Sequence, residues 1–117
     1  MKYLSEVNDR RIILNLKREW FEKIRSGEKR IEYRKVGPYW IGRFCRPVMK
    51  GNGVNNGYEI KKFKTVEFRC GYSKKDALVF EITNIDIGPC PYEGWDGDYF
   101  RIHLGALIVI ERNGWWR

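Results

Sequence analysis

The sequence has few of the residues that build disulfide frameworks and soft-metal sites. It contains three cysteines (Cys45, Cys70 and Cys90) and one histidine (His103) among 117 residues. The cysteines are odd in number and far apart, and no Cys-x-x-Cys pair is present. A disulfide framework or a zinc site requires closer, paired spacing. We therefore expect buried free thiols, no metal site and no cofactor.

Long apolar segments and targeting signals are missing too. No uninterrupted apolar run approaches the ~20 residues that a membrane-spanning helix needs. The opening segment Met1–Glu6 is charged and has too few apolar residues for a secretory signal. These absences predict a cytoplasmic protein with no membrane partner. The length predicts a single domain over residues 1–117, with residues 1–10 as a loosely held lead-in.

The net charge of +8 is distributed unevenly along the chain. Residues 17–35 hold eight basic and four acidic side chains, and residues 36–75 hold nine basic and two acidic ones. Residues 76–117 reverse this balance, with three basic and seven acidic side chains. Such asymmetry indicates a side that faces a polyanion, which in a cytoplasmic protein means nucleic acid first. The alternative is a generally basic soluble protein.

Hydrophobic periodicity predicts five or six strands and one clear helix. Arg11–Leu16 alternates as a strand, residues 17–26 follow a helical period, and Gly27 suits the left-handed position that ends a helix. Further strands are predicted at Arg30–Arg34, Thr65–Cys70, Ala77–Ile85 and Tyr99–Glu111, the last broken near Gly105. Tyr39–Phe44 is expected to form one helical turn, and Gly71–Asp76 and Gly88–Asp98 are expected to be loops.

Two segments in the middle of the chain leave alternatives open. Residues 49–60 contain two Asn-Gly steps and no apolar periodicity, so they form either a flexible loop, which we favour, or a hairpin. Lys61, Lys62 and Lys64 follow, interleaved with aromatic residues. These lysines either grip a nucleic-acid backbone while the aromatic rings stack bases, or keep an exposed strand edge soluble.

The segment Ser26–Arg34 concentrates charge directly after the helix. Strand alternation predicts that Ile31 and Tyr33 face a core, while Glu32 and Arg34 leave the opposite face. The alternative is a solvated strand face with a weak surface ion pair. The candidate ligand-binding residues here are Lys29, Arg30, Glu32 and Arg34.

These residue types fit phosphate chemistry. Lysine holds a phosphate as a point charge and arginine as a two-pronged donor. Glu32 could orient Arg34 or accept a proton. Glu81 is a carboxylate in an otherwise apolar strand, so it either is buried with a cation of the segment as its partner or points to solvent.

The spacing Gly27-x-Lys29-x-x-Glu32-x-Arg34 after a helix resembles the signature of the ASCH domain family. The match covers Ile12–Lys35 and extends more loosely over Ala77–Glu111. That family adopts a small β-barrel similar to the PUA fold. The resemblance therefore implies an α+β protein, a small mixed PUA-like β-barrel of five or six strands with one main helix (17–26) packed beside it.

The resemblance also implies a function. ASCH domains resemble RNA-binding modules, some members resemble ribonucleases of single-stranded RNA, and another branch hydrolyses acylated cytidine with a lysine, a threonine and a glutamate. Lys29 matches that lysine and Glu81 matches the glutamate, but Glu32 stands where the branch has threonine, so the nucleophilic hydroxyl is missing. The candidate catalytic residues are Lys29, Glu32 and Glu81.

The combined hypothesis is an ASCH-domain protein that binds RNA, or a nucleotide-like ligand, in a basic cleft. The protein could in addition cleave the RNA that it binds. Glu93, Asp96 and Asp98 would then bind a divalent metal, and the alternative is that they form a solvated loop. The alternatives are an amidohydrolase of acylated nucleosides such as N4-acetylcytidine, and a protein-interaction module. We further expect Glu32 or Glu81 to hold Arg34.

Overall fold

The chain forms two compact units. The computed structural model describes residues 10–49, 51, 53, 55–71, 76–112 and 115–116. The first unit comprises Met1–Glu32, Lys62–Asn84 and Ile102–Arg117, and the second comprises Tyr33–Lys61 and Ile85–Arg101. The predicted lead-in over residues 1–9 and the predicted loop over residues 72–75 lie outside the described residues, as do Lys50, Asn52 and Val54.

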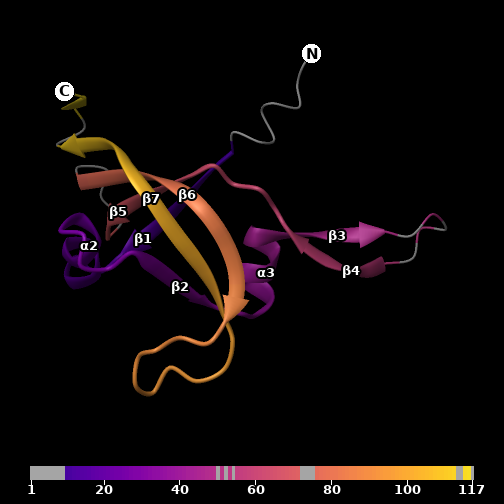
Figure 1. The fold of residues 1–117 in the computed structure, drawn as a ribbon. Helices are drawn as coiled ribbons and strands as arrows, with labels where there is room; N and C mark the ends of the chain where they lie inside the picture. Colours follow the sequence, from indigo (N-terminus) through magenta and orange to yellow (C-terminus); the bar gives the residue numbers. More distant parts are fainter. Residues whose placement is uncertain are drawn as a thin grey trace, which may run out of the picture. The chain divides into compact units, whose positions relative to one another are not determined.

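The secondary structure is α+β, as predicted, and Figure 1 shows the elements along the chain. The helices are α2 (Arg18–Arg25) and α3 (Pro38–Phe44). The strands are β1 (Arg11–Leu16), β2 (Ile31–Lys35), β3 (Cys45–Met49), β4 (Asn55–Ile60), β5 (Thr65–Cys70), β6 (Asp76–Gly88), β7 (Tyr99–Arg112) and β8 (Trp115–Trp116). Among the described residues, one sheet has six strands in the order β1-β5-β6-β7-β2, with β8 paired to β7. It is mixed, since β1 and β5 are parallel whereas β5 and β6 are antiparallel.

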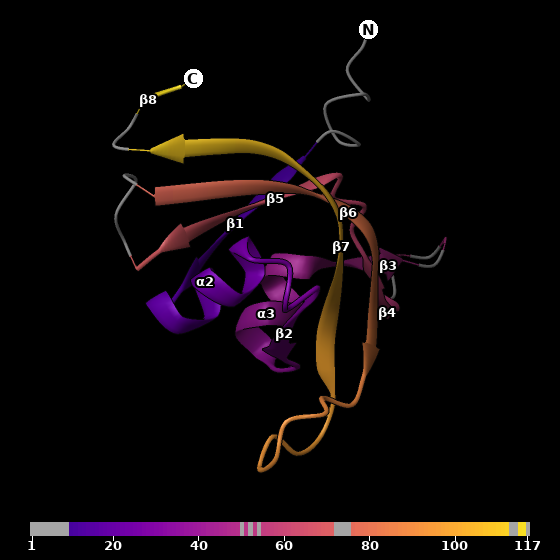
Figure 2. The same cartoon turned by 60° about the vertical axis from the view of Figure 1, so that its left-hand side comes forward.

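The core of the first unit follows the alternation predicted from the sequence. Along β1 every second residue is buried, and these are Ile12, Leu14 and Leu16. The helix α2 buries Phe21 and Ile24 and packs against β1 and β5, and the two views of the ribbon agree on this placement (Figures 1 and 2). Its observed bounds are one residue shorter at each end than predicted, because Lys17 and Ser26 are the capping residues.

The second unit contains α3 and a two-stranded antiparallel sheet that pairs β3 with β4. The short helix predicted near Tyr39–Phe44 is confirmed as α3. The favoured loop over residues 49–60 is wrong for Asn55–Ile60, which forms β4, so the hairpin alternative describes this segment. Asn56-Gly57 lies within β4 rather than in a turn, and cross-strand partners such as Arg46 and Glu59 extend the pairing.

The three cysteines differ in how deeply they are buried. Cys45, Cys70 and Cys90 are free, and burial raises the pKa of the Cys45 thiol. Because only the thiolate is alkylated, Cys45 should react more slowly at pH 8 than the half-buried Cys70. Mass spectrometry after iodoacetamide treatment would measure the order of labelling, and guanidinium-unfolded protein is the control in which the difference should vanish. Faster labelling of Cys45 in the folded protein would contradict its burial.

Candidate functional site

The turn after α2 brings Lys29 back to the helix. Gly27 has a φ of 88°, the left-handed conformation that glycine adopts without a steric penalty. Its N–H donates to the carbonyl of Ile24 at 3.1 Å, and the N–H of Lys29 donates to the carbonyl of Lys23 at 3.0 Å. The role predicted for Gly27 is therefore confirmed. The turn fixes the backbone of Lys29 before β2 begins.

Lys29 and Glu32 form a buried ion pair within the first unit. The Nζ of Lys29 lies 2.6 Å from Oε1 of Glu32, and the two residues are 8% and 4% exposed. The ring of Trp20 lies beside the ammonium, with its centre 4.6 Å from Nζ. Buried charges are tolerated when each has a partner, and here the ammonium and the carboxylate form an ion pair. The indole adds a cation–π contact.

The burial of Glu32 corrects the predicted facing of β2. Ile31 and Tyr33, expected in a core, are half-buried, whereas Glu32, expected on the open face, is buried. Period-two reasoning assigns a carboxylate to the solvent side, and it fails here because Lys29 neutralises this one. The alternative of a weak surface ion pair is wrong for the same reason.

Arg30 makes structural hydrogen bonds within the first unit. Its Nη2 donates to the carbonyls of Leu104 and Gly105 at 3.1 and 2.8 Å, and its own carbonyl accepts the N–H of Leu104 at 3.0 Å. These contacts tie the segment before β2 to β7. A ligand-binding role for Arg30 stays a prediction.

In the second unit, Arg34 is held against an aromatic ring. Its Cζ lies 4.9 Å from the centre of the Trp40 ring. Trp40 in turn stacks on Phe44, with centroids 5.6 Å apart and planes 30° apart, and Phe44 is fully buried. The guanidinium is thus pre-oriented by a ring that the core supports. That Glu32 or Glu81 also holds Arg34, and that Lys29, Glu32 and Arg34 line one cleft, stay predictions.

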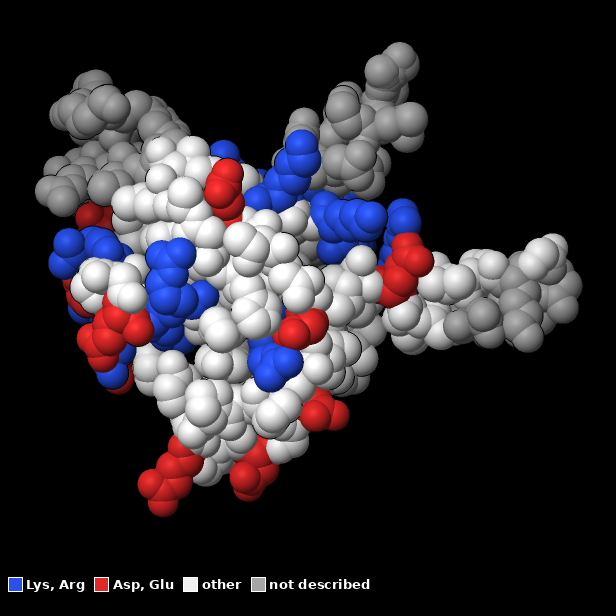
Figure 3. All heavy atoms as spheres, viewed as in Figure 1, with Lys and Arg blue, Asp and Glu red and all other residues white. Residues whose placement is uncertain are grey.

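The three candidate lysines differ in exposure. Lys62 and Lys64 are exposed, and Lys61 is half-buried. Figure 3 shows that Lys and Arg side chains reach the surface on the face turned to the viewer. A ligand-binding role for Lys61, Lys62 and Lys64 is compatible with this exposure and stays a prediction.

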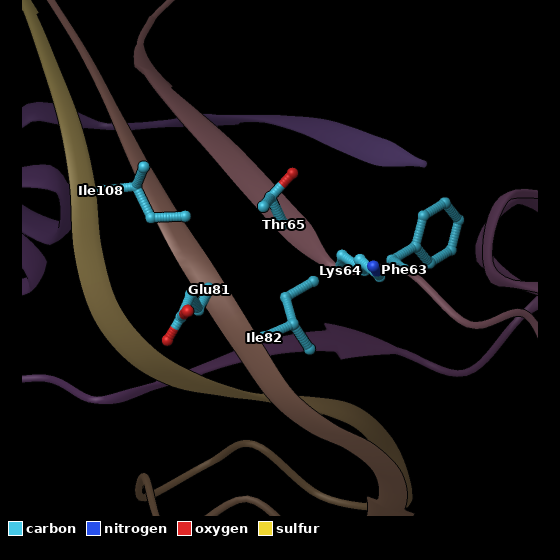
Figure 4. A pocket seen from close by; sticks show the side chains of 6 residues that line it. All are labelled: Phe63, Lys64, Thr65, Glu81, Ile82 and Ile108. Carbon is cyan, nitrogen blue, oxygen red and sulfur yellow. The ribbon is translucent and has the colours of Figure 1, made fainter. Parts of the chain in front are cut away.

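Lys64 and Glu81 line one hollow of the first unit, of about 380 Å³ (Figure 4). Thr65 and Glu81 are register partners on β5 and β6, which puts their side chains on the same face. Glu81 is exposed, so the solvent-facing alternative for it is confirmed. The full lining is Phe63, Lys64, Thr65, Glu81, Ile82 and Ile108, and it includes neither Lys29 nor Glu32.

Gly105 makes room for the Glu81 carboxylate. A Cβ at this glycine would lie 3.2 Å from Oε1 of Glu81 and 3.0 Å from Cγ2 of Thr83. The carboxylate also accepts a long hydrogen bond from the N–H of Ala106, at 3.4 Å. The strand break predicted near Gly105 is wrong, because β7 runs through it. The glycine is needed here for the close approach of a neighbouring side chain.

Sequence reasoning missed Tyr39 and Arg43 as candidate ligand-binding residues. They are neighbours on α3, where Nη1 of Arg43 donates to the Tyr39 hydroxyl at 3.0 Å. The sequence signal for this pair is that Tyr39 and Arg43 are four residues apart in a segment that begins at Pro38, because residues i and i+4 share a helix face. The helical turn was predicted, but the contact between the Arg43 guanidinium and the Tyr39 hydroxyl on it was not.

Within the described ranges, no group of three or more His, Cys, Asp or Glu side chains could hold a metal ion. No helix in the same part of the chain is both long and apolar enough to cross a membrane. Comparison with protein-family models, curated proteins and solved structures finds no match.

Proposed function

We propose that this protein binds single-stranded RNA or a nucleotide-like ligand, with Arg34 as a phosphate contact. The observation that carries the proposal is the guanidinium of Arg34 held 4.9 Å from the centre of the Trp40 ring. A guanidinium grips phosphate through a planar fork, and a fork that is oriented in advance loses less entropy on binding. The basic balance of residues 17–75 supplies long-range attraction for a polyanion.

The resemblance to ASCH domains belongs to this proposal. The Gly27-x-Lys29-x-x-Glu32-x-Arg34 spacing, the helix before it and the mixed sheet all support it. A PUA-like barrel is the fold that we propose on this basis. A cytoplasmic location is part of the same proposal, and the three free thiols suit a reducing compartment.

The Lys29–Glu32 pair favours binding over amide hydrolysis. An amidohydrolase of the resembling branch needs a lysine near a nucleophilic hydroxyl, whereas here the ammonium donates to a buried carboxylate at 2.6 Å. The hydroxyl that would act as the nucleophile in that branch is replaced here by the Glu32 carboxylate. We therefore rank RNA binding above the hydrolysis of acylated nucleosides and above a protein-interaction module.

Arg34→Lys should weaken RNA binding by about tenfold, because lysine keeps the charge but loses one arm of the fork. Fluorescence anisotropy with a labelled single-stranded oligonucleotide would measure the affinity. Arg46→Lys is the matched control, because Arg46 also lies in the second unit but is paired with Glu59 at 2.6 Å. Equal affinities of wild type and Arg34→Lys, or no binding by wild type, would refute the proposal.

The same RNA, recovered after incubation with and without Mg²⁺ or Mn²⁺, distinguishes binding from cutting on a denaturing gel. Intact RNA supports a binding protein, while cleavage that Lys29→Ala abolishes in a folded protein would establish a ribonuclease. Turnover of N4-acetylcytidine in a parallel assay would reverse the ranking and favour the amidohydrolase.

A further inference from the structure

Two aromatic rings and two guanidinium groups meet in the second unit, on α3 and β2. We call this set, Arg34, Tyr39, Trp40 and Arg43, the α3 cluster. The Tyr39 and Trp40 rings are in edge-on contact, with centroids 4.7 Å apart and planes 85° apart. The Cζ of Arg43 lies 5.9 Å from the Tyr39 ring centre and 5.8 Å from that of Trp40. With Arg34 on Trp40, two guanidinium groups therefore flank one indole.

The cluster is anchored in the core. Trp40 stacks on Phe44, and Phe44 contacts Phe100 with centroids 5.0 Å apart. Both phenylalanines are 0% exposed, so this series of rings leads from the buried interior to the half-buried Trp40. A surface whose rings rest on the core is pre-organised, and little of its binding energy is lost to ordering side chains.

Tyr39 ends the series at the surface, where 64% of it is exposed. A single exposed aromatic residue is ordinary in a soluble protein. Tyr39 differs in being held by a cation, since Nη1 of Arg43 donates to its hydroxyl and the guanidinium carbon lies over its ring. An exposed ring in contact with a guanidinium group combines what single-stranded nucleic acids require, a stacking platform and a cation for the backbone.

We infer that the α3 cluster is the site of one unpaired base of single-stranded RNA. The base stacks on Tyr39, and Arg43 and Arg34 contact the neighbouring phosphates. The charge is complementary, because α3 contains no acidic residue and carries a basic residue in its last turn. A duplex hides the faces of its bases, so the cluster selects single strands. This inference rests on the proposed RNA binding and adds the residues that stack one base and contact its neighbouring phosphates.

The test compares two oligonucleotides, an oligoadenylate and an abasic chain of the same length, on wild type and on Tyr39→Ala. Stacking on an aromatic residue contributes enough that Tyr39→Ala should weaken oligoadenylate binding by about fivefold or more. Affinity for the abasic chain should be unchanged. Tyr39→Phe keeps the ring and should stay within about twofold of wild type. Tyr39 is exposed, so its truncation should leave the midpoint of urea unfolding unchanged.

The proposed phosphate contact of Arg43 is tested through the salt dependence of RNA binding. Arg43→Gln should reduce the slope of log affinity against log salt by about 0.7, the value for one lost phosphate contact on a single strand. Arg46→Gln removes the same charge from the same unit, but Arg46 is paired with Glu59 at 2.6 Å. The slope of log affinity against log salt for Arg46→Gln should therefore equal that of wild type.

The outcomes separate this inference from the proposed function. If Arg34→Lys weakens RNA binding while Tyr39→Ala has no effect on oligoadenylate, the base-stacking site is refuted and the proposed function stands. Equal binding of oligoadenylate and the abasic chain by wild type would also refute it. If wild type binds neither chain, both the inference and the proposed function fail.

Discussion

Replacing Lys29 by methionine is expected to lower the free energy of unfolding by about 3–5 kcal/mol, because it removes the ammonium that compensates a buried carboxylate. Nζ of Lys29 donates to Glu32 at 2.6 Å, and both side chains are less than a tenth exposed. Such a loss is a large fraction of the stability of a small domain. Urea unfolding followed by tryptophan fluorescence would measure it as a lower midpoint.

The matched control is the double variant Lys29→Met with Glu32→Leu. An apolar pair of similar volume also removes the uncompensated carboxylate, so the free energy of unfolding should return to within about 1 kcal/mol of wild type. If Lys29→Met alone unfolds at the wild-type midpoint, the ion pair does not contribute to the stability of the fold. If the double variant is as unstable as the single one, loss of packing rather than orphaned charge is responsible.

This outcome decides how any activity data on Lys29 are interpreted. A variant that loses RNA cleavage or binding because it unfolds says nothing about catalysis. The double variant separates the two roles, since it restores the fold without the ammonium. RNA binding that survives in it would assign Lys29 and Glu32 to the scaffold, and binding that is lost would assign them to the ligand.

The elements of the first unit could be predicted because local pattern and tertiary packing agree there. Alternation along Arg11–Leu16 matches the burial of β1, and the glycine after α2 has the left-handed conformation that ends a helix. Thr65–Cys70 and Ala77–Ile85 likewise fall within β5 and β6. In β1 and β5 the apolar residues mark the buried face, and in β6 the apolar run Ala77–Phe80 is buried on both faces.

The site was harder to predict because its residues depend on partners distant from them in sequence or facing them across a turn. Glu32 is buried in an ion pair with Lys29, which lies across the turn from it. The platform under Arg34 requires contact between β2 and Trp40 on α3, a tertiary contact that periodicity does not reveal. Cross-strand pairing, which periodicity does not reveal, makes Asn55–Ile60 a strand.

Reversing the charges of Lys61, Lys62 and Lys64 together is expected to weaken the binding of single-stranded RNA by about hundredfold at low salt, the largest effect on affinity that we predict. The slope of log affinity against log salt should flatten by about 2, since each lost phosphate contact removes about 0.7. The fold should survive, because the backbone N–H groups of Lys61 and Lys64, not their side chains, make the bonds to Phe44 and Arg10.

The control variant is Lys17→Glu, an exposed lysine at the start of α2 for which we propose no ligand contact. Its salt slope should equal that of wild type, because an exposed charge that touches no phosphate releases no counterion on binding. A triple variant with the wild-type slope would show instead that Lys61, Lys62 and Lys64 solubilise a strand edge. Because Arg34 is varied separately, RNA binding could then still be assigned to the second unit.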